Sequence, residues 1–399
     1  MSSSEVGAAG PAGAAATGAL PRIPLAEPSI GGNAREYLEE CLRSNYVSSV
    51  GPFVTRFEEA FAAAVGARFA VACSTGTAAI HLALAALDVE PGADVLLPSL
   101  TFVASANPIQ YVGAKPVFVD SEPTTLNLDP GLVVEELDRR ARAGQRQPAA
   151  IEVVELVGHP ADIEPLMVAA ERYGIPVIED ASEAVGATYV GGRHDGRHVG
   201  TIGRLGCFSF NGNKLITTGG GGMVVTDDEA LARRVRHLST QARLPGLAYD
   251  HDEVGYNYRL SNLASALGLA QLEQLDELLA GRRANAAFYD GVAAELPGLE
   301  PAPRVPWARS SYWLYTARLS PDARIDRDGL LTALAAAGIE GRPIWTPLHL
   351  TKLYRDAPRI GGEVAETIFR QAVSLPSSSN LGDAGRARVA AVLRGTLSV

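Results

Sequence analysis

Lysine is scarce in this sequence. Of 399 residues, 35 are lysine or arginine, and only three of these are lysine. Arginine forms ion pairs and binds phosphate at least as well as lysine does, but its guanidinium stays protonated and cannot act as an amine nucleophile. Chemistry that needs a side-chain amine is therefore restricted to Lys115, Lys214 or Lys352.

Cysteine is sparse as well. Cys41, Cys73 and Cys207 lie far apart, without the spacing of a metal site. An odd and low cysteine count is typical of a reducing compartment. We therefore expect a cytoplasmic protein that holds no metal.

The sequence also has no block of lysine or arginine and no long apolar run. Its 45 acidic residues exceed its 35 basic ones, which gives a net charge of −10. Nucleic acids and anionic membranes attract concentrated positive charge, so neither is expected as a partner. The most apolar stretch, residues 69–87, is interrupted by Ser74, Thr75, Gly76, Thr77 and His81, so it is not a membrane span.

What the sequence does contain is the pattern of a large globular protein. Residues 1–22, rich in Ala, Gly and Ser, predict a flexible tail. From residue 69, short apolar runs alternate with amphipathic helical stretches, which is typical of an α/β fold with a mainly parallel sheet. We place a large domain at 23–250 and a smaller one at 251–399. The strands expected in the large domain include 69–73, 94–97, 115–119, 152–157 and 175–178.

The first candidate site is Ser74-Thr75-Gly76-Thr77, between an expected strand and an expected helix. Free backbone N–H groups at a helix N-terminus bind phosphate or other anions. Taken alone, the segment is a weak signal, because Ser or Thr before a helix is more often only a helix cap.

The second candidate is Asp180, at the end of the apolar run 175–178. Ligands of parallel sheets bind at the carboxyl ends of the strands, although Asp is also a common cap. Glu183, expected one helical turn further on, points to the same place.

The third candidate is Lys214, in SFNGNKLITTGGGGM (209–223), where four glycines give the backbone room to approach a ligand. Lys115 and Lys352 lack such a setting. A reactive amine, a strand-end carboxylate and a phosphate-binding turn together indicate pyridoxal phosphate. In that chemistry a lysine forms a Schiff base and a carboxylate keeps the ring nitrogen protonated.

Six motifs in order resemble the DegT/DnrJ/StrS sugar aminotransferases, pyridoxal-phosphate enzymes of the aspartate aminotransferase fold (fold type I). The resemblance runs from about residue 23 to residue 381. It implies a large domain with a seven-stranded, mainly parallel sheet between helices, and a smaller C-terminal α+β domain. The motifs are NYVSSVGPFVTRFE (45–58), STGTAAIHLAL (74–84), PSLTFVASAN (98–107), EDASEA (179–184), SFNGNKLITTGGGGM (209–223) and GYNYRLSNLASALGLAQLEQLD (255–276).

The resemblance also implies roles at the cofactor ring. Lys214 would form the Schiff base and later move the proton between substrate and cofactor. Asp180 would pair with the pyridine nitrogen, and Glu183 would approach the ring hydroxyl. Phe102 would stack on the ring, although an aromatic residue beside a strand is often plain core.

For the cofactor phosphate, the resemblance implies Gly76, Thr77 and Ser209. Asn257 would reach the phosphate of the neighbouring subunit, which makes a homodimer with shared sites the functional unit. Asn257 can equally be only a turn residue.

The implied reaction is a transamination in two halves. L-Glutamate would convert the cofactor to pyridoxamine phosphate, and the amine would then pass to a nucleotide-linked keto-deoxy-sugar. The segments RPIWTPLHL, GGEVAE and LPSSS look most like those of members that act at C4 of a UDP- or dTDP-linked 4-keto-6-deoxyhexose. Thr346 stands where many relatives have Lys, which leaves the exact substrate open. A keto-cyclitol or a C3-keto nucleotide sugar is the alternative acceptor, and a non-enzymatic nucleotide-binding module is the alternative outside enzymes.

Overall fold

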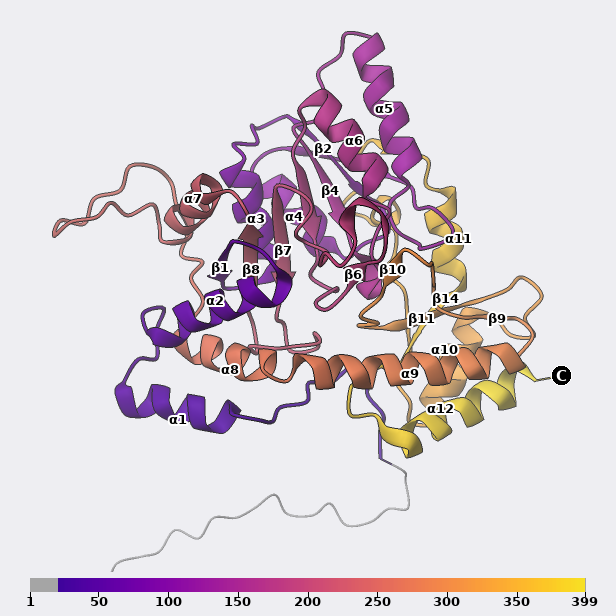
Figure 1. Cartoon of the computed structure of the whole chain (residues 1–399). Coiled ribbons are helices and arrows are strands. Elements are labelled where there is room, and N and C mark those ends of the chain that lie inside the picture. Colours follow the sequence, from indigo (N-terminus) through magenta and orange to yellow (C-terminus); the bar gives the residue numbers. More distant parts are fainter. Residues whose placement is uncertain (1–20, 399) are drawn as a thin grey trace, which may run out of the picture.

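The computed structural model describes residues 21–398 (Figure 1). The predicted tail, residues 1–22, therefore lies outside the described residues apart from Pro21 and Arg22. Ile23 donates its N–H to the carbonyl of Gly338, which ties the start of the described chain to its C-terminal part. Among the described residues, no helix has the length and apolar character needed to cross a bilayer.

An eight-stranded sheet forms the centre of the molecule. β8 runs antiparallel to both of its neighbours and the remaining pairs are parallel, so the expected mainly parallel sheet is confirmed. Seven strands come from the N-terminal part of the chain, and a short eighth one, β13, comes from the C-terminal part. The order is β1 (Phe69–Cys73), β8 (Gly222–Thr226), β7 (Leu205–Ser209), β5 (Val177–Asp180), β4 (Ala150–Val154), β2 (Asp94–Pro98), β3 (Lys115–Val119) and β13 (Arg359–Ile360).

Helices cover both faces of this sheet. Two separate apolar clusters, one on each face of the sheet, form the core. They arise because the strands are buried on both faces and direct apolar side chains to each of them. One cluster contains α2 (Pro52–Val65), α5 (Pro130–Arg142), α6 (Glu164–Tyr173) and α8 (Asn262–Leu272), and α1 (Ala34–Ser44) packs on α8. The other contains α3 (Gly76–Ala86), α4 (Val103–Tyr111) and α7 (Glu229–Ser239).

A smaller antiparallel sheet lies in the C-terminal part. Its strands pack with α9, α10 and α12 around a third apolar cluster. The order is β12 (Arg342–Pro343), β14 (Ala372–Leu375), β11 (Tyr315–Leu319) and β9 (Leu299–Glu300). The remaining elements are α9 (Leu275–Glu295), α10 (Arg327–Ala336), α11 (Glu363–Gln371), α12 (Gly382–Leu397), the pair β6 (Thr188–Tyr189) and β10 (Ala308–Arg309), and the 3-10 turns Leu156–Gly158, Gly192–His194 and Leu348–Leu350.

The predicted domain division at residue 250 stays a prediction. Some segments beyond it belong with the large sheet: α8 packs on α1 and α2, and β13 pairs with β3. All four strands of the smaller sheet, and the helices that pack on it, come from residue 275 onward.

One expected strand ends early. The run 152–157 was expected to be extended, but β4 ends at Val154 and the chain turns at Leu156–Gly158. Val157 there has a φ of 50°, which is unfavourable for a β-branched residue. Its N–H donates to Oε2 of Glu183 at 2.7 Å, so a contact from a distant segment overrides the local preference of the sequence.

Candidate functional site

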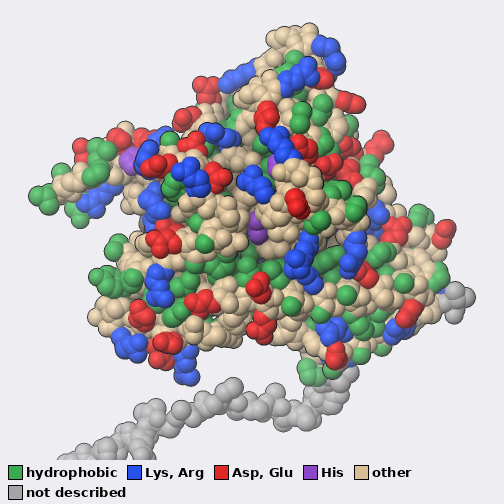
Figure 2. Space-filling model, viewed as in Figure 1, with side chains coloured by type: hydrophobic (Ala, Val, Ile, Leu, Met, Phe, Trp, Pro, Cys, Tyr) green, Lys and Arg blue, Asp and Glu red, His purple; other side chains and the backbone are tan. Residues whose placement is uncertain are grey.

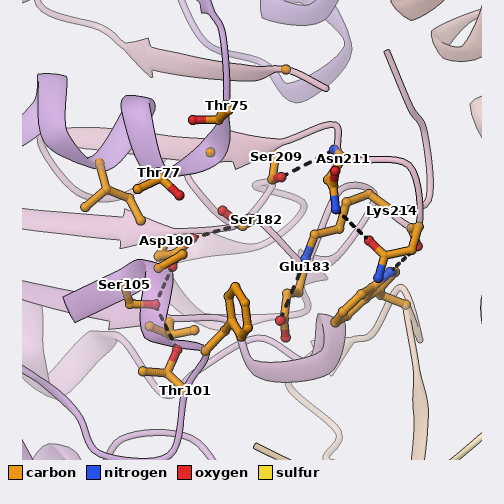
Figure 3. A pocket seen from close by; sticks show the side chains of 18 of the residues that line it. Thr75, Thr77, Thr101, Ser105, Asp180, Ser182, Glu183, Ser209, Asn211 and Lys214 are labelled. Carbon is orange, nitrogen blue, oxygen red and sulfur yellow. Dashed lines mark hydrogen bonds and ion pairs between the residues drawn. The ribbon is translucent and has the colours of Figure 1, made fainter. Parts of the chain in front are cut away.

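A cavity of about 290 Å³ lies where β5 and β7 end and where the chain leaves β1 and β2 (Figure 3). This is the carboxyl edge of the parallel strands, where ligands of open α/β sheets bind. Seven of the eight residues singled out from the sequence line it: Gly76, Thr77, Phe102, Asp180, Glu183, Ser209 and Lys214. The fold therefore brings together residues from four separate segments.

One wall of the cavity is the N-terminus of α3. Thr75 caps the helix through its side chain, which accepts from the N–H of Ala78 at 2.9 Å. The helix itself offers no acceptor for the N–H groups of its first turn, Gly76 and Thr77 included, so they suit an anion. A Cβ on Gly76 would lie 2.7 Å from Cβ of Ser209, so only glycine allows this close approach.

Asp180 is held by a chain of hydroxyl groups. Ser105 donates from Oγ to Oδ2 of Asp180 at 2.8 Å, and the N–H of Ser182 donates to Oδ1 at 3.1 Å. The hydroxyl of Thr101 lies 2.8 Å from that of Ser105; because the Ser105 hydrogen is directed to Asp180, Thr101 is the donor in that pair. Asp180 is thus a buried carboxylate in a fixed orientation.

Lys214 and Glu183 lie side by side in the cavity. Nζ of Lys214 lies 3.8 Å from Oε1 of Glu183, and the two side chains are 14% and 6% exposed. Burial lowers the pKa of Lys214, and the carboxylates of Glu183 and Asp180 oppose this shift. Burial raises the pKa of Glu183, while the Lys214 amine and the N–H of Val157 oppose it. Removing charge from water disfavours the charged form of each group, so the amine is held closer to its neutral, nucleophilic form than a surface lysine.

Residues 28–394 match the model of the DegT/DnrJ/EryC1/StrS aminotransferase family. The chain belongs to this family. EpsN of Bacillus subtilis strain 168, whose name describes a pyridoxal phosphate-dependent aminotransferase, is 42% identical over 93% of this chain and 95% of its own length. A GDP-perosamine synthase of Caulobacter vibrioides is 41% identical over 94% of this chain and 98% of its own length. The solved structure of DesI with its TDP-sugar product has a TM-score of 0.83 and 32% identity, and covers 94% of this chain and 92% of that one.

Family membership makes the chain a pyridoxal phosphate-dependent aminotransferase with the fold that the sequence resemblance implied. The alternative of a non-enzymatic nucleotide-binding module is thereby set aside. The cavity fits the cofactor of the family on structural grounds. The close approach of Gly76 to Ser209 forms a cradle that a Cβ would fill, and a carboxylate and a buried amine lie on its other sides. The individual contacts to the cofactor remain predictions.

Phe102 lies on the cavity wall and is 49% exposed, so it is not a core residue. Its ring packs 5.0 Å from the ring of Trp345. Its predicted stacking on the cofactor ring fits this position.

Asn257 is the one predicted residue outside the cavity. It lines a separate hollow together with Arg243, Leu244 and Arg259. Within one chain it therefore does not reach the other site residues, and its predicted role requires a second subunit.

Several residues that line this cavity were not singled out from the sequence, and four of them shape it most directly. Ser105 and Thr101 orient Asp180, while Trp313 and Trp345 form an aromatic wall. The tryptophans carried a usable signal, because the sequence has only three of them. Glu183 was expected one helical turn after Asp180; residues 181–187 instead form irregular turns, and these still direct its carboxylate into the cavity.

Proposed function

We propose that this aminotransferase moves the amino group of L-glutamate to the ketone of a nucleotide-linked keto-deoxy-sugar, at C4 of a 4-keto-6-deoxyhexose. The observation that carries the proposal is the position of the Lys214 amine, buried beside Glu183 in a cavity that also holds Asp180 and the N-terminus of α3. A buried amine with a lowered pKa is suited both to attack a carbonyl and to transfer a proton.

Each residue has a distinct part in this reaction. When bound, pyridoxal phosphate supplies an electron sink for the bond broken at the substrate carbon. Lys214 would hold the cofactor through Nζ and, when free, would carry the proton to or from the reacting carbon. Asp180, oriented by Ser105, would keep a proton on the ring nitrogen. The N–H groups of Gly76 and Thr77, with the hydroxyl of Ser209, would hold the phosphate.

The size of the cavity supports a substrate that extends beyond it. About 290 Å³ is at the lower limit for small-molecule sites, so the cofactor and the reacting sugar would fill it. The nucleotide would then lie at the mouth, near exposed Phe102 and exposed Thr346. The relatives include a protein crystallised with a TDP-sugar and one named for a GDP-linked sugar, so GDP joins UDP and dTDP as a nucleotide to test.

A homodimer with shared sites is part of the proposal. The segment between α7 and α8 projects from the body (Figure 1), and it carries Leu247 and Tyr249 with 103% and 83% exposure. Exposed apolar side chains gathered on one segment are typical of an interaction surface. Asn257, on the same segment, would complete the cavity of the partner, which explains why it lies outside the cavity of its own chain.

The test is an amine-transfer assay with the purified chain, pyridoxal phosphate and L-glutamate. The acceptor panel holds UDP-, dTDP- and GDP-linked 4-keto-6-deoxyhexoses, a 3-keto nucleotide sugar and a keto-inositol. We expect 2-oxoglutarate to form with at least one 4-keto nucleotide sugar. Turnover of the keto-inositol alone would contradict the sugar assignment, and turnover of the 3-keto sugar alone would contradict C4. Absence of 2-oxoglutarate alongside transfer from another amino acid would contradict glutamate as donor.

A further inference from the structure

Trp313 covers the amine of Lys214. Nζ of Lys214 lies over the Trp313 ring, 3.8 Å from its centroid. A cation this close to the face of an indole is attracted by the negative charge density of the ring, and Trp is the strongest of the aromatic partners. The amine therefore has two partners at the same distance, the aromatic face of Trp313 and the Glu183 carboxylate, whose Oε1 is also 3.8 Å away.

The Trp313 ring is fixed in this position from two sides. Its indole N–H donates to the carbonyl of Asn213, the residue before Lys214, at 2.8 Å. Its own carbonyl accepts from the guanidinium of Arg282, a buried residue of α9, at 2.7 Å. The residue is 1% exposed, so the chain packs around it.

Glu183, the second partner of the amine, is fixed equally well. Glu183 accepts from the N–H of Val157 at 2.7 Å, and it is buried. Val157 adopts a strained backbone conformation, with a φ of 50°, at the position that provides this N–H. Both partners of the amine are thus preorganised, one from the C-terminal part of the chain and one from the large sheet.

We propose that Trp313 is a positioning residue that, with Glu183, holds the protonated Lys214 amine whenever it is not bonded to the cofactor. The inference rests on the proposed function, in which Lys214 is released from the cofactor in each half reaction and transfers a proton. A released amine on a flexible four-carbon chain needs a defined resting place to act repeatedly at one carbon. The face of the Trp313 ring provides this resting place, because it attracts the protonated amine and carries no formal charge of its own.

The scarcity of lysine makes a direct test possible. Trace acylation of the full-length, cofactor-free chain, read by mass spectrometry across a pH series, gives the titration midpoint of Lys214. Exposed Lys115 and Lys352 serve as internal references in the same sample. The midpoint reports the pKa of the amine and is insensitive to its accessibility.

Two variants separate the aromatic face from the indole N–H. Trp313→Phe keeps a ring face but loses the bond to the Asn213 carbonyl, whereas Trp313→Leu loses both. We expect the Lys214 midpoint to fall from wild type to Phe and further to Leu, with about two- to tenfold more neutral amine at a fixed pH in Leu. Water that enters beside a smaller side chain would solvate the protonated amine and raise the midpoint. A fall in the midpoint therefore indicates the loss of the aromatic face. Equal midpoints for Phe and Leu, or a rise in Leu, would overturn the proposal.

A second measurement covers the case in which Trp313→Leu fails to fold. Fluorinated tryptophan, incorporated only at position 313, keeps the shape of the side chain and its indole N–H. The fluorine atoms withdraw negative charge density from the face of the ring. The Lys214 midpoint should fall with each added fluorine, and an unchanged midpoint would also overturn the proposal. If wild-type Lys214 does not bind the cofactor or transfer an amine, the proposed function fails; if it does both and the midpoints do not move, only this inference fails.

Discussion

Ser105 donates a hydrogen bond of 2.8 Å to the carboxylate of Asp180, and so links helix α4 to the end of strand β5. Both residues are buried, and Thr101 donates in turn to Ser105. The orientation of the carboxylate that would face the cofactor therefore depends on an uncharged residue of a neighbouring helix.

Ser105→Ala should weaken cofactor binding. A hydrogen bond to a charged acceptor contributes about 1.5–3 kcal/mol, part of which the Ser182 N–H retains, so we expect a roughly three- to thirtyfold rise in the dissociation constant of pyridoxal phosphate. Absorbance or fluorescence titration measures it. Ser265→Ala, the same deletion at a buried serine of α8, is the matched control and should leave the constant unchanged. Equal constants for the two variants would count against the role of Asp180.

Gly76→Ala should damage the phosphate cradle. The added Cβ would lie 2.7 Å from Cβ of Ser209, so one of the two segments has to move. Displacing the first turn of α3 by a few tenths of an ångström lengthens its contacts to an anion, and we expect at least a roughly tenfold weaker cofactor affinity.

Gly291→Ala is the control for this substitution. Gly291 lies within α9 and a Cβ there meets nothing within 4 Å. Alanine is the better helix former by about 1 kcal/mol, so this variant should bind the cofactor normally and be slightly more stable. Normal cofactor affinity in Gly76→Ala would show that the phosphate lies elsewhere.

Glu152 should make stability depend on pH. It is fully buried on β4, and among the described residues neither of its carboxylate oxygens has a hydrogen-bond partner. Burial raises its pKa well above the ordinary value, and the nearby Asp180 charge raises it further. The folded protein thus binds this proton more tightly than the unfolded chain does, whose Glu pKa is about 4.3. The stabilisation is complete below that pH and is lost as the pH rises toward the folded pKa.

Glu152→Gln removes this proton equilibrium at nearly constant size. We expect the variant to gain on wild type in free energy of unfolding by up to about 1.4 kcal/mol for each pH unit between pH 5 and the folded pKa. Thermal or denaturant unfolding at pH 5, 6 and 7 measures the difference. A difference that stays constant with pH would mean that Glu152 is ionised in the folded protein, with a counter-ion or water as partner.

Shared active sites can be tested by mixing two inactive variants. Lys214→Ala and Asn257→Ala should each be strongly impaired as pure dimers. In a mixed dimer, one of the two cavities receives an intact Lys214 from one chain and an intact Asn257 from the other. Random exchange makes half of the dimers mixed, so about a quarter of wild-type activity should return. Activity that stays at the level of the separate variants would contradict the shared site.

Local patterns in the sequence predicted a substantial part of this fold. β1 and β3 have the bounds that their apolar runs indicate, because a strand buried on both faces leaves a continuous apolar signal. The early end of β4 could not be predicted. Val157 favours an extended conformation locally, and its turn depends on Glu183, which lies 26 residues further along the chain.

The candidate site, like the fold, could be predicted from the sequence only in part. Lys214 stood out because few lysines compete with it, and Asp180 because it ends an apolar run. Trp313 follows Lys214 by 99 residues, and no periodicity connects the two, so only the folded chain shows the ring above the amine. Ser105 lies in helix α4, where a serine carries no sign in the sequence of a distant carboxylate as its partner.

The most direct test of the central claim is borohydride reduction of the cofactor-loaded protein, followed by peptide mapping. Reduction fixes the cofactor to the lysine that binds it, and the chain offers only three candidates. We predict one labelled peptide, containing Lys214, and no labelling of that peptide in Lys214→Arg. Label on Lys115 or Lys352, or no lysine label in a protein that transfers amines, would contradict the account.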